Sequence, residues 1–584
     1  GSYHFICECY FLTATTLHLG LLKVAAECMS KLQEMQRHQR TFQDLERLRD
    51  VYTAGPGAAE YEQKMQELKD ILAKATEERL SYETVLQDPN VLAPALGFAR
   101  LTAALLLKTG AAASPGGGGP LALPLPLPCP MSFAMLPEFL VDDLADLLLY
   151  VSRFAIQELG KETMDEIMEC LVVFMGSPLY IKNPYLRSKF VEVLRLWIPA
   201  GIPSGVAPPP ENLVRLFESP NVRTLPHLVP HLLALYVDIE FTGSHTQFYD
   251  KFNIRYNIGE LLEYLWTIPA HQASWVQLAS SDPGFYIRFI NMLINDAIYL
   301  LDESLKKLPE IKELEAAMDN AAEWAAQPPQ QRQEREATLN QSRRIVHSDL
   351  TLANVHIRMM QYTTEKITAT FLLPEMVERI AGMLDYFMMY LAGPERKKLR
   401  IKDPERYGFK PKELLTQITD IYLHLTAGDA EGVFHPAVAR DARSYRDQVF
   451  VAAAEVLRSL GLQAESKVRA FEAFAEKVRG AAALDQEEEE TFGDIPDDFL
   501  DPIQCTLMKD PVILPTSGQT LDRATIQRHL LSEQRDPFSR ALLTVDMLQP
   551  ATELKAKIDA WVEEQKSSRR QQQQSQAQAM DTTP

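Results

Sequence analysis

The sequence predicts a mostly α-helical chain, built as an elongated stack of helical pairs, that ends in a small mixed α+β domain. Three observations predict this class. Apolar residues recur at spacings of three and four along most of the chain. The chain has 584 residues, which is too long for one bundle core. Strand-like alternation is confined to about the last eighty residues. No strict repeat period is visible, so an irregular multi-bundle α protein is an alternative.

The helical body contains one segment that is apolar on nearly every face. It runs from Phe285 to Leu305 with the sequence FYIRFINMLINDAIYLLDESL. A helix of this kind has to be covered on both sides, so we expect it in the middle of a stack. The acidic run Asp485–Glu490 repels itself, and we expect it to stay solvated near the end of the body.

Low-complexity stretches divide the chain. One such stretch, at 114–130, is rich in Gly and Pro. Pro lacks an amide donor and Gly is a weak helix former, so this stretch predicts a flexible insert. The first residues, Gly1-Ser2, replace an initiator Met and are typical of a cloning scar. The predicted organisation is a helical body at 3–490 with the insert at about 111–130 and a polar loop at about 327–336, a C-terminal domain at 491–566, and a disordered tail at 567–584.

Composition limits the partners. Apolar residues make up 46% and charged residues 24% of the chain, as in folded globular proteins. The formal charge of -20 disfavours nucleic acid and anionic membranes, so proteins are the expected partners.

No run of roughly 20 uninterrupted apolar residues is present, and we expect no membrane span. Six scattered cysteines suit a reducing compartment, which predicts the cytoplasm and nucleus. Nothing indicates a symmetric assembly, so we expect a monomer.

Local residue patterns predict the secondary structure of the C-terminal domain. Val512–Leu514 and Thr520-Leu521, separated by the turn Pro515–Gly518, predict a short hairpin. Asp522 then caps a helix that carries Ile526 and Leu530 on one face. A last helix begins at 550–552, and its apolar stripe consists of Leu554, Ile558, Trp561 and Val562.

Two irregular loops flank the central helix, an arrangement typical of a cross-braced zinc domain. Two tetrahedral zinc sites need about eight Cys and His ligands. Only Cys505 and His529 are available, so counting excludes zinc, and we expect no metal or other cofactor. A domain of about seventy residues has a marginal core, so a polar network has to replace the metal. Its candidate members are Asp501, Asp510, Ser517, Asp522, Arg523, His529, Asp536 and Arg540.

Several long motifs resemble one known family. DPIQCTLMKDPVILP, LDRATIQRHL, DPFSRALLT and ELKAKIDAW are similar to a U-box, the zinc-free ubiquitin-ligase domain. LPEFLVDDLADLLLY, YIKNPYLRSKFVEVL, FTGSHTQFYDKFNIRY and DPERYGFKPKELLTQITDIYLHL resemble the core of the ubiquitin conjugation factors. These are the chain-elongating U-box ligases of the ubiquitin-fusion-degradation pathway. The resemblance runs from about residue 10 to 565.

The resemblance implies an armadillo-like body and a U-box that recruits a ubiquitin-charged conjugating enzyme to form or extend polyubiquitin chains for proteasomal degradation. The reactive cysteine belongs to that enzyme, so this chain needs no catalytic residue of its own. Arg540 resembles the activating residue that bridges conjugating enzyme and ubiquitin. Ile503, Met508 and Pro537 resemble the groove that binds the conjugating enzyme, and Cys505 stands where some U-boxes place a contacting aromatic residue.

The implied partners are a conjugating enzyme, ubiquitin, ubiquitin-like domains of proteasome shuttle factors, and a segregase ATPase of the valosin-containing type. One alternative stays open at this point, an α-solenoid adaptor whose U-box is catalytically silent, which Cys505 would favour. A zinc-dependent ligase, which the ligand count argues against, would contain metal when purified, and elemental analysis that finds none would close it.

Overall fold

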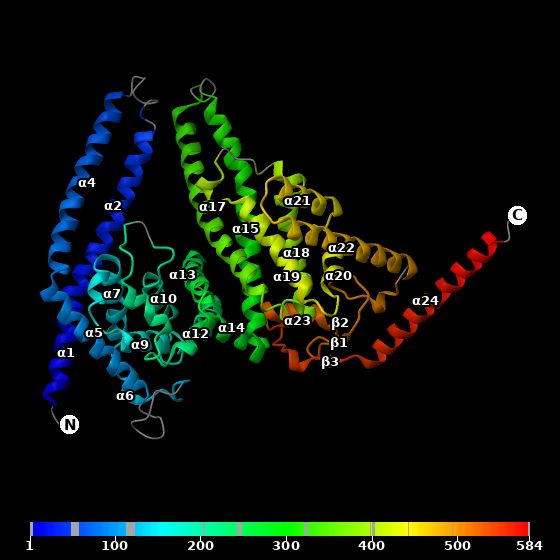
Figure 1. Ribbon diagram of the computed structural model, residues 1–584, viewed down its shortest axis with the longest axis horizontal. Helices are drawn as coiled ribbons and strands as arrows, with labels where there is room; N and C mark the ends of the chain where they lie inside the picture. Colours follow the sequence, from blue (N-terminus) through cyan, green and yellow to red (C-terminus); the bar gives the residue numbers. More distant parts are fainter. Residues whose placement is uncertain are drawn as a thin grey trace. The chain divides into compact units, whose positions relative to one another are not determined.

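The computed structural model describes residues 4–47, 49, 58–111, 123–202, 205–241, 248–320, 324, 326–397, 399, 403–441, 443–492 and 495–581. The chain divides into two compact units, Gly1–Trp275 and Val276–Pro584. Figure 1 colours both units along the sequence. Strands occur only near the C-terminal end of the described chain, so the predicted mostly α class is confirmed.

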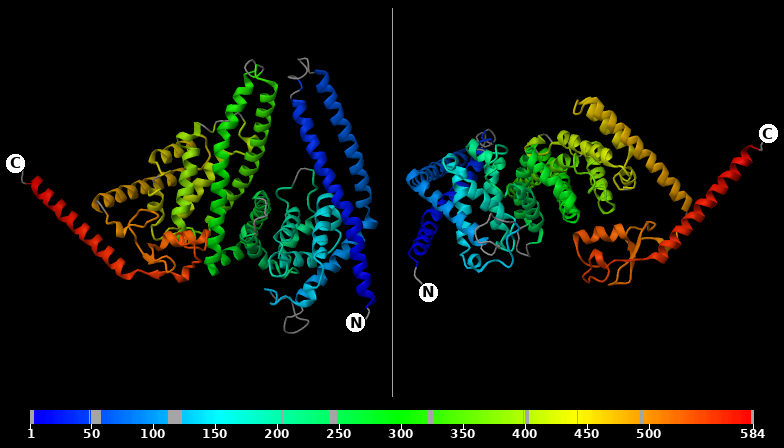
Figure 2. Two further views of the ribbon diagram at one scale, coloured as in Figure 1. Left: turned by 180° about the vertical axis from the view of Figure 1, so that it is seen from behind. Right: turned by 60° about the horizontal axis from the view of Figure 1, so that its bottom comes forward.

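The regular elements of the first unit are all helices in its described residues. Its helix α2 (Lys23–Arg47) and helix α4 (Ala58–Leu86) lie side by side as a long hairpin in Figures 1 and 2. The other elements are α1 (Phe5–Leu17), the π-helix η1 (His18–Leu22), α5 (Pro89–Gly110), α6 (Met131–Ala134), α7 (Phe139–Phe154), α8 (Ile156–Leu159), α9 (Asp165–Met175), α10 (Pro184–Leu196), α11 (Glu211–Arg215), η2 (Leu216–Glu218), η3 (Leu225–His227), α12 (Leu228–Asp238), η4 (Ile239–Phe241) and α13 (Phe248–Trp266). Helix α14 (Pro269–Ser281) contains the division between the units.

Helix α9 forms the centre of the first unit. Cys170 and Phe174, on this helix, are fully buried. The helix packs against α5, α10 and α12, so it is covered on several sides. Packing of one buried helix between several others is consistent with a stack of irregular helical repeats.

The second unit begins with α15 (Pro283–Asp319) and α17 (Pro329–Thr364), a second long hairpin that is visible in both figures. Helix α15 includes the apolar segment Phe285–Leu305 and packs on α17, α18 (Pro374–Leu391) and α23 (Arg523–Ser532), which confirms the helix expected to be covered on both sides. The helices of the body that follow are α18 (Pro374–Leu391), η5 (Pro394–Lys397), η6 (Glu405–Tyr407), α19 (Pro411–Gly428), α20 (Phe434–Ala439), α21 (Asp447–Ser459) and α22 (Glu465–Phe492).

The polar run at about 327–336 is helical from Pro329 on, so most of it is not a loop. Helix α17 begins at Pro329, and proline is favoured at a first helical position because its missing amide is not needed there. Packing against α15 supplies what the polar sequence lacks. Further along α17, Arg343 donates to Glu315 of α15 at 2.7 Å. Tertiary pairing therefore decides the state of this segment.

The structure describes parts of three other predicted segments: the insert, the acidic run and the C-terminal tail. Residues 112–122 of the insert lie outside the described residues, whereas its end is tied to the fold, because Leu125 is buried and Tyr180 donates to the Pro126 carbonyl at 2.5 Å. The acidic run at 485–490 belongs to α22, and its residues Gln486 and Glu487 are exposed, as expected of a solvated run. The expected tail at 567–584 continues as helix α24 (Thr552–Asp581) up to Asp581.

Two helical stretches among the described residues are long and apolar enough to cross a membrane by length and composition alone. They are Phe5–Glu46 and Pro89–Gly110. This test of mean hydropathy allows charged residues within the helix, so it differs from the uninterrupted apolar run considered in the sequence prediction. Core helices pass the same test, and α5 uses its apolar residues for packing, since Leu92, Leu96 and Leu106 are buried against neighbours that include α7 and α9.

A buried carboxyl in the second unit gives a pH-dependent prediction. Asp385 on α18 is 1% exposed, and burial raises its pKa well above the ordinary value, aided by the charge of Asp441 and only partly opposed by the hydroxyl of Tyr422, which donates to it at 2.5 Å. The folded state therefore binds a proton that the unfolded state releases, so stability falls as the pH rises above the unfolded pKa.

Replacing Asp385 with asparagine removes this pH-dependent loss, because the amide is neutral and its oxygen can still accept from Tyr422. We expect Asp385→Asn to be at least as stable as the wild type at pH 5 and more stable at pH 8. Urea denaturation at the two pH values measures the difference. The stability gained by the variant over the wild type should be larger at pH 8 than at pH 5. A smaller gain at pH 8 would contradict the raised pKa of Asp385.

Candidate functional site

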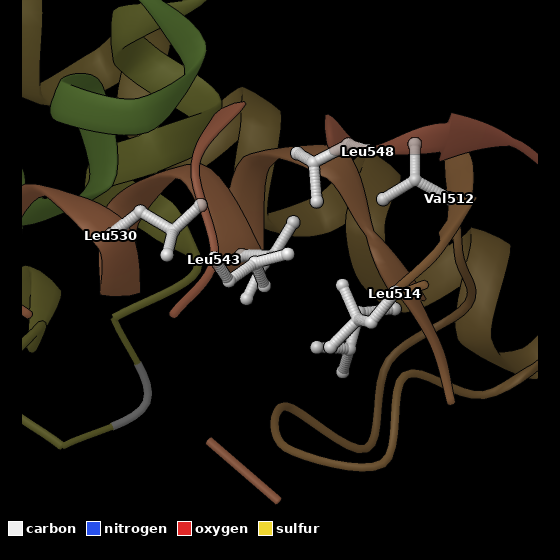
Figure 3. Packing of buried hydrophobic residues seen from close by; sticks show 7 residues of the cluster. Val512, Leu514, Leu530, Leu543 and Leu548 are labelled. Carbon is white, nitrogen blue, oxygen red and sulfur yellow. The ribbon is translucent and has the colours of Figure 1, made fainter. Parts of the chain in front are cut away.

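The C-terminal domain is held together by a small apolar core. Its sheet has the order β2-β1-β3, with β1 (Pro511–Ile513) paired antiparallel to both β2 (Thr520–Asp522) and β3 (Gln549–Pro550). The central helix is α23 (Arg523–Ser532), and the short helices η7 (Asp497–Phe499) and η8 (Val545–Met547) complete the domain before α24. Figure 3 shows how the core side chains meet; they are Val512, Leu514, Leu521, Ile526, Leu530, Leu543 and Leu548. The hairpin and the capped helix predicted from the sequence are both present.

The first loop is organised by the buried carboxylate of Asp501. One carboxylate oxygen of this residue accepts from the amides of Ile503 and Gln504 at 2.8 and 2.9 Å. The other accepts from the amide of Asp522 at 2.8 Å and so ties the loop to the start of α23. The Cys505 amide donates to the Asp501 carbonyl at 2.7 Å and closes the turn. A single carboxylate thus satisfies three backbone donors.

The second loop repeats this pattern around Asp536. Its carboxylate accepts from the amides of Phe538 and Ser539 at 2.8 and 3.1 Å and from the hydroxyl of Thr516. The Arg540 amide donates to the Asp536 carbonyl at 2.9 Å, as Cys505 does in the first loop. Burial by itself would raise the pKa of Asp536, but the hydrogen bonds of the hydroxyls and amides around it lower the pKa to about 2. The carboxylate therefore stays charged under all ordinary conditions.

The two loops are equivalent in backbone conformation. Each begins with Asp-Pro, at 501–502 and 536–537, and each has its fifth residue in the left-handed region. These fifth residues are Cys505, with φ of 56°, and Arg540, with φ of 62°. Among non-glycine residues described by the structure, only these two have positive φ. The conformation costs about 1–2 kcal/mol for each residue, so the aspartate hydrogen bonds have to hold it in place.

Asp522 connects the loops to the central helix. It is the N-cap of α23, accepting from the Ala524 amide at 3.1 Å, and it also accepts from the amides of Lys509 and Asp510. Arg523 donates to the Asp510 carboxylate at 2.6 Å. At the other end of α23, His529 Nε2 lies 2.9 Å from the Arg535 carbonyl oxygen, to which it donates. Ser517 lies in the turn between β1 and β2.

The structure separates the predicted groove residues into exposed and buried ones. Ile503 is 45% exposed, Cys505 is exposed and Pro537 is half-buried. Met508 is only 2% exposed, because its amide donates to the Phe499 carbonyl and its side chain points into the domain. Met508 therefore does not offer surface to a partner, contrary to the expectation from the sequence.

Phe538 is a further exposed residue that the sequence pattern did not single out. This side chain is 45% exposed and occupies the position in the second loop that Ile503 occupies in the first. The signal that could have identified it is the repeated Asp-Pro: counting one residue on from each proline gives Ile503 and Phe538. An exposed aromatic ring held on a rigid loop is a typical anchor of a protein–protein interface.

Arg540 extends from the second loop into solvent. Its side chain is 68% exposed, and its guanidinium lies 3.3 Å from a carboxylate oxygen of Glu533. Arg535 donates to the Arg540 carbonyl at 3.1 Å, so the backbone of Arg540 is held while its side chain can reach other acceptors. A surface ion pair of this kind is weak, about 0–1 kcal/mol, and is easily exchanged for new partners.

The chemistry available at this surface is binding and orientation. Among the described residues, no group of three or more His, Cys, Asp or Glu side chains is arranged to hold a metal ion. The aspartates that could coordinate a cation are already engaged by backbone amides. An exposed apolar side chain on each of two ordered loops, and an exposed guanidinium on the second loop, fit a surface that binds another protein and holds part of it in one orientation.

Comparison with known proteins gives the family. Residues 1–479 match the family described as ubiquitin elongating factor core, and residues 495–567 match the U-box domain. A probable ubiquitin conjugation factor E4 of Arabidopsis thaliana is 46% identical over 571 residues, which cover 97% of this chain and 53% of that protein. Ubiquitin conjugation factor E4 A of Pongo abelii is 35% identical over 98% of this chain and 53% of its own length.

The E4 ubiquitin-protein ligase UFD2 of Saccharomyces cerevisiae is 35% identical over 436 residues, 73% of this chain and 44% of that protein. The chain thus spans about half the length of the curated relatives that it matches. The matches to the core and to the U-box follow each other in one chain, and together they cover the helical body and the two-loop domain described above. The chain belongs to the ubiquitin conjugation factor E4 family.

Proposed function

We propose that this chain is a U-box ubiquitin ligase that recruits a ubiquitin-charged conjugating enzyme and promotes the formation or elongation of polyubiquitin chains on substrates for proteasomal degradation. One observation carries the proposal. Two matched Asp-Pro loops hold Ile503 and Phe538 at the surface, and Arg540, on the same loop as Phe538, has an accessible guanidinium. The names of the relatives, which include a ubiquitin-protein ligase, support the same reaction class.

In this proposal the apolar residues bind and the arginine activates. The partner's thioester cysteine reacts, and the chain contributes no nucleophile. Arg540 bridges the conjugating enzyme and ubiquitin, and so restricts a tethered ubiquitin to the orientation in which an incoming lysine can attack. A gain of ten- to a hundredfold in rate requires only about 1.4 to 2.8 kcal/mol of preferential stabilisation. Weak apolar contacts suit a partner that has to leave after each transfer.

The test is a chain-synthesis assay with purified components. The chain is mixed with activating enzyme, ubiquitin and each member of a panel of conjugating enzymes, and the discharge of the thioester is followed over time. A ligase accelerates discharge with at least one member of the panel. An unchanged rate with every member would favour the alternative, an interaction-only adaptor, for which the exposed Cys505 is the supporting feature.

Phe538 gives a separate prediction about binding. Replacing Phe538 with alanine removes an exposed aromatic anchor, and we expect the dissociation constant for the conjugating enzyme to rise about tenfold, equal to about 1.4 kcal/mol. Titration calorimetry with the uncharged enzyme measures the change. Val451 on α21 is similarly exposed, and Val451→Ala is the matched control with unchanged affinity. Equal affinities for Phe538→Ala and the wild type would place the binding surface elsewhere.

The proposal also includes two further partners and a cellular location. The family resemblance supports binding of ubiquitin-like domains of proteasome shuttle factors by the N-terminal part of the helical body, and association with a segregase ATPase of the valosin-containing type. The six free cysteines support a reducing compartment, and we propose the cytoplasm and nucleus. Co-purification with each partner, using this chain alone, tests the two interactions separately.

A further inference from the structure

The central helix of the U-box has a second face that the U-box core does not use. Ile526 and Leu530 point into the core. Thr525 and Arg528 lie on other sides of the helix, and Thr525 is only 6% exposed. Helix α23 packs against α18 and α15, both of which belong to the helical body of the same unit. The U-box is therefore docked on the body through the helix that separates its two loops.

One ion pair joins the two parts across this contact. Arg528 of α23 lies 2.9 Å from a carboxylate oxygen of Glu378 on α18. The arginine side chain is 20% exposed, so it is largely sheltered between the helices. The next residue on α18, Arg379, donates to the amide oxygen of Asn295 on α15. The contact thus involves polar side chains from three helices.

Glu378 pairs with Arg528 and also offsets the repulsion between Arg528 and Arg379. Burial and the charge of Arg528 both lower the pKa of Arg379, which means that the two guanidinium groups repel each other. Glu378 is the carboxylate that pairs with Arg528 in this contact. Removing Glu378 leaves two like charges facing each other, whereas removing Arg528 leaves none. Loss of Glu378 should therefore open the contact more than loss of Arg528 does.

The docked arrangement leaves the partner-binding surface free. Ile503, Phe538 and Arg540 remain exposed while α23 packs on the body. A conjugating enzyme bound to the loops would then have a fixed direction relative to α15 and α18. Docking of this kind cannot change the chemistry at the thioester, but it can decide which lysines come within reach of it.

We propose that the Arg528–Glu378 ion pair is a latch that docks the U-box on the helical body and so determines which acceptor lysines receive ubiquitin. The proposal rests on the proposed ligase function and adds a positioning role for two residues outside the loops. Both residues lie outside the two loops that the proposed function assigns to the conjugating enzyme. The latch acts on the transfer to lysines held by the chain and has no effect on transfer to a free amine in solution.

The contact is tested first without any enzyme activity. Arg528→Lys keeps the charge and places an amine next to the Glu378 carboxylate. A carbodiimide then joins groups that form an ion pair, and mass spectrometry identifies the linked peptides. We expect a cross-link between residues 528 and 378 in the full chain. Arg528→Gln, which has no primary amine, is the negative control. No cross-link in Arg528→Lys would overturn the latch directly.

The functional arm compares two readouts of the same charged enzyme. Discharge of ubiquitin to free lysine in solution measures activation by the loops alone. Self-modification of the chain depends also on how the bound conjugating enzyme is oriented relative to the helical body. We expect Arg528→Glu and Glu378→Arg each to lower the rate at the wild type's main self-modified lysines at least threefold and to spread the product over other lysines. Discharge to free lysine stays within twofold of the wild type in all variants.

The charge swap provides the rescue. In Arg528→Glu with Glu378→Arg the ion pair is re-formed with opposite polarity, and Arg379 now faces an acidic side chain. We expect the lysine pattern and rate of the wild type to return. Lys555→Glu, a charge reversal in α24 that pairs within its own helix, should change neither readout. Glu378→Gln should disturb the pattern more than Arg528→Gln, because only the former leaves the two guanidinium groups unscreened.

The outcomes separate the two proposals. If the wild type accelerates discharge but the single variants modify the same lysines at the same rate, the latch has no positioning role. If the single variants are impaired and the swap is not restored, the substitutions act through general damage to the domain and the latch is again overturned. If the wild type fails to accelerate discharge with any conjugating enzyme, the ligase function itself fails, whatever the cross-link shows.

Discussion

Replacing Arg540 with alanine lowers the stimulated discharge of ubiquitin ten- to a hundredfold and leaves the U-box folded. The guanidinium is 68% exposed and contributes only one weak ion pair to the domain. The backbone hydrogen bond of residue 540 to the Asp536 carbonyl is unaffected, and alanine carries the same cost as arginine in the left-handed region. The loss therefore falls on activation, equal to about 1.4 to 2.8 kcal/mol in the transition state.

Single-turnover discharge of a preloaded conjugating enzyme measures this effect. The affinity of the uncharged enzyme should change little, since Ile503 and Phe538 supply the apolar contact. Arg540→Lys separates charge from shape, and we expect it to recover only part of the rate because an ammonium cannot bridge two acceptors as a planar guanidinium does. Glu533→Gln frees the guanidinium from its present partner and should not reduce the rate. Full activity in Arg540→Ala would remove this residue from the mechanism.

Replacing Asp501 with alanine destabilises the U-box by about 3 kcal/mol, because it deprives backbone amides of their acceptor and the cost of a buried unsatisfied donor is roughly 1–3 kcal/mol. Asp501 is fully buried, and its carboxylate accepts from the amides of Ile503, Gln504 and Asp522. The amide of Asp522 lies between β2 and α23, so its loss weakens the link between the sheet and the helix as well as the first loop.

Hydrogen exchange resolved by peptide follows this change in the full chain. A loss of about 3 kcal/mol corresponds to roughly hundredfold faster exchange of the protected amides in β1, β2 and α23. Asp501→Asn should lie between the wild type and Asp501→Ala, because one oxygen remains for the loop while the new amide group faces the donor of Asp522. Asp498, in η7, is exposed, and Asp498→Ala is the matched control with unchanged exchange. Unaltered protection in Asp501→Ala would show that water replaces the carboxylate at little cost.

Local patterns predicted much of the U-box. The alternation at Val512–Leu514, the turn after it and the cap at Asp522 each depend on residues close together in the chain, and the structure has the expected hairpin and helix. Met508 and Phe538 could not be assigned in the same way. Both are apolar residues in irregular loops, and nothing local distinguishes the one that the core buries from the one that stays exposed.

The helical body shows the same limit at larger scale. Apolar periodicity identified the helix that became α15, because apolar residues on nearly every face of the segment indicate that the helix is buried. The polar run before Arg335 had no such signal, and it became the start of α17 only because α15 lies alongside it. The ion pair between Arg528 and Glu378 joins residues 150 positions apart, and no spacing rule connects them.

The sequence by itself determined the helical class, the place of the small C-terminal domain and the aspartates that replace metal in it, because helix periodicity, turn residues and capping act over a few neighbouring positions. The tertiary structure alone decided that Cys505 and Arg540 occupy equivalent strained positions, that Met508 is buried while Phe538 is exposed, and that α23 docks on α18. Each of these depends on which surfaces meet after the chain has folded, and burial and long-range pairing are properties of that packing.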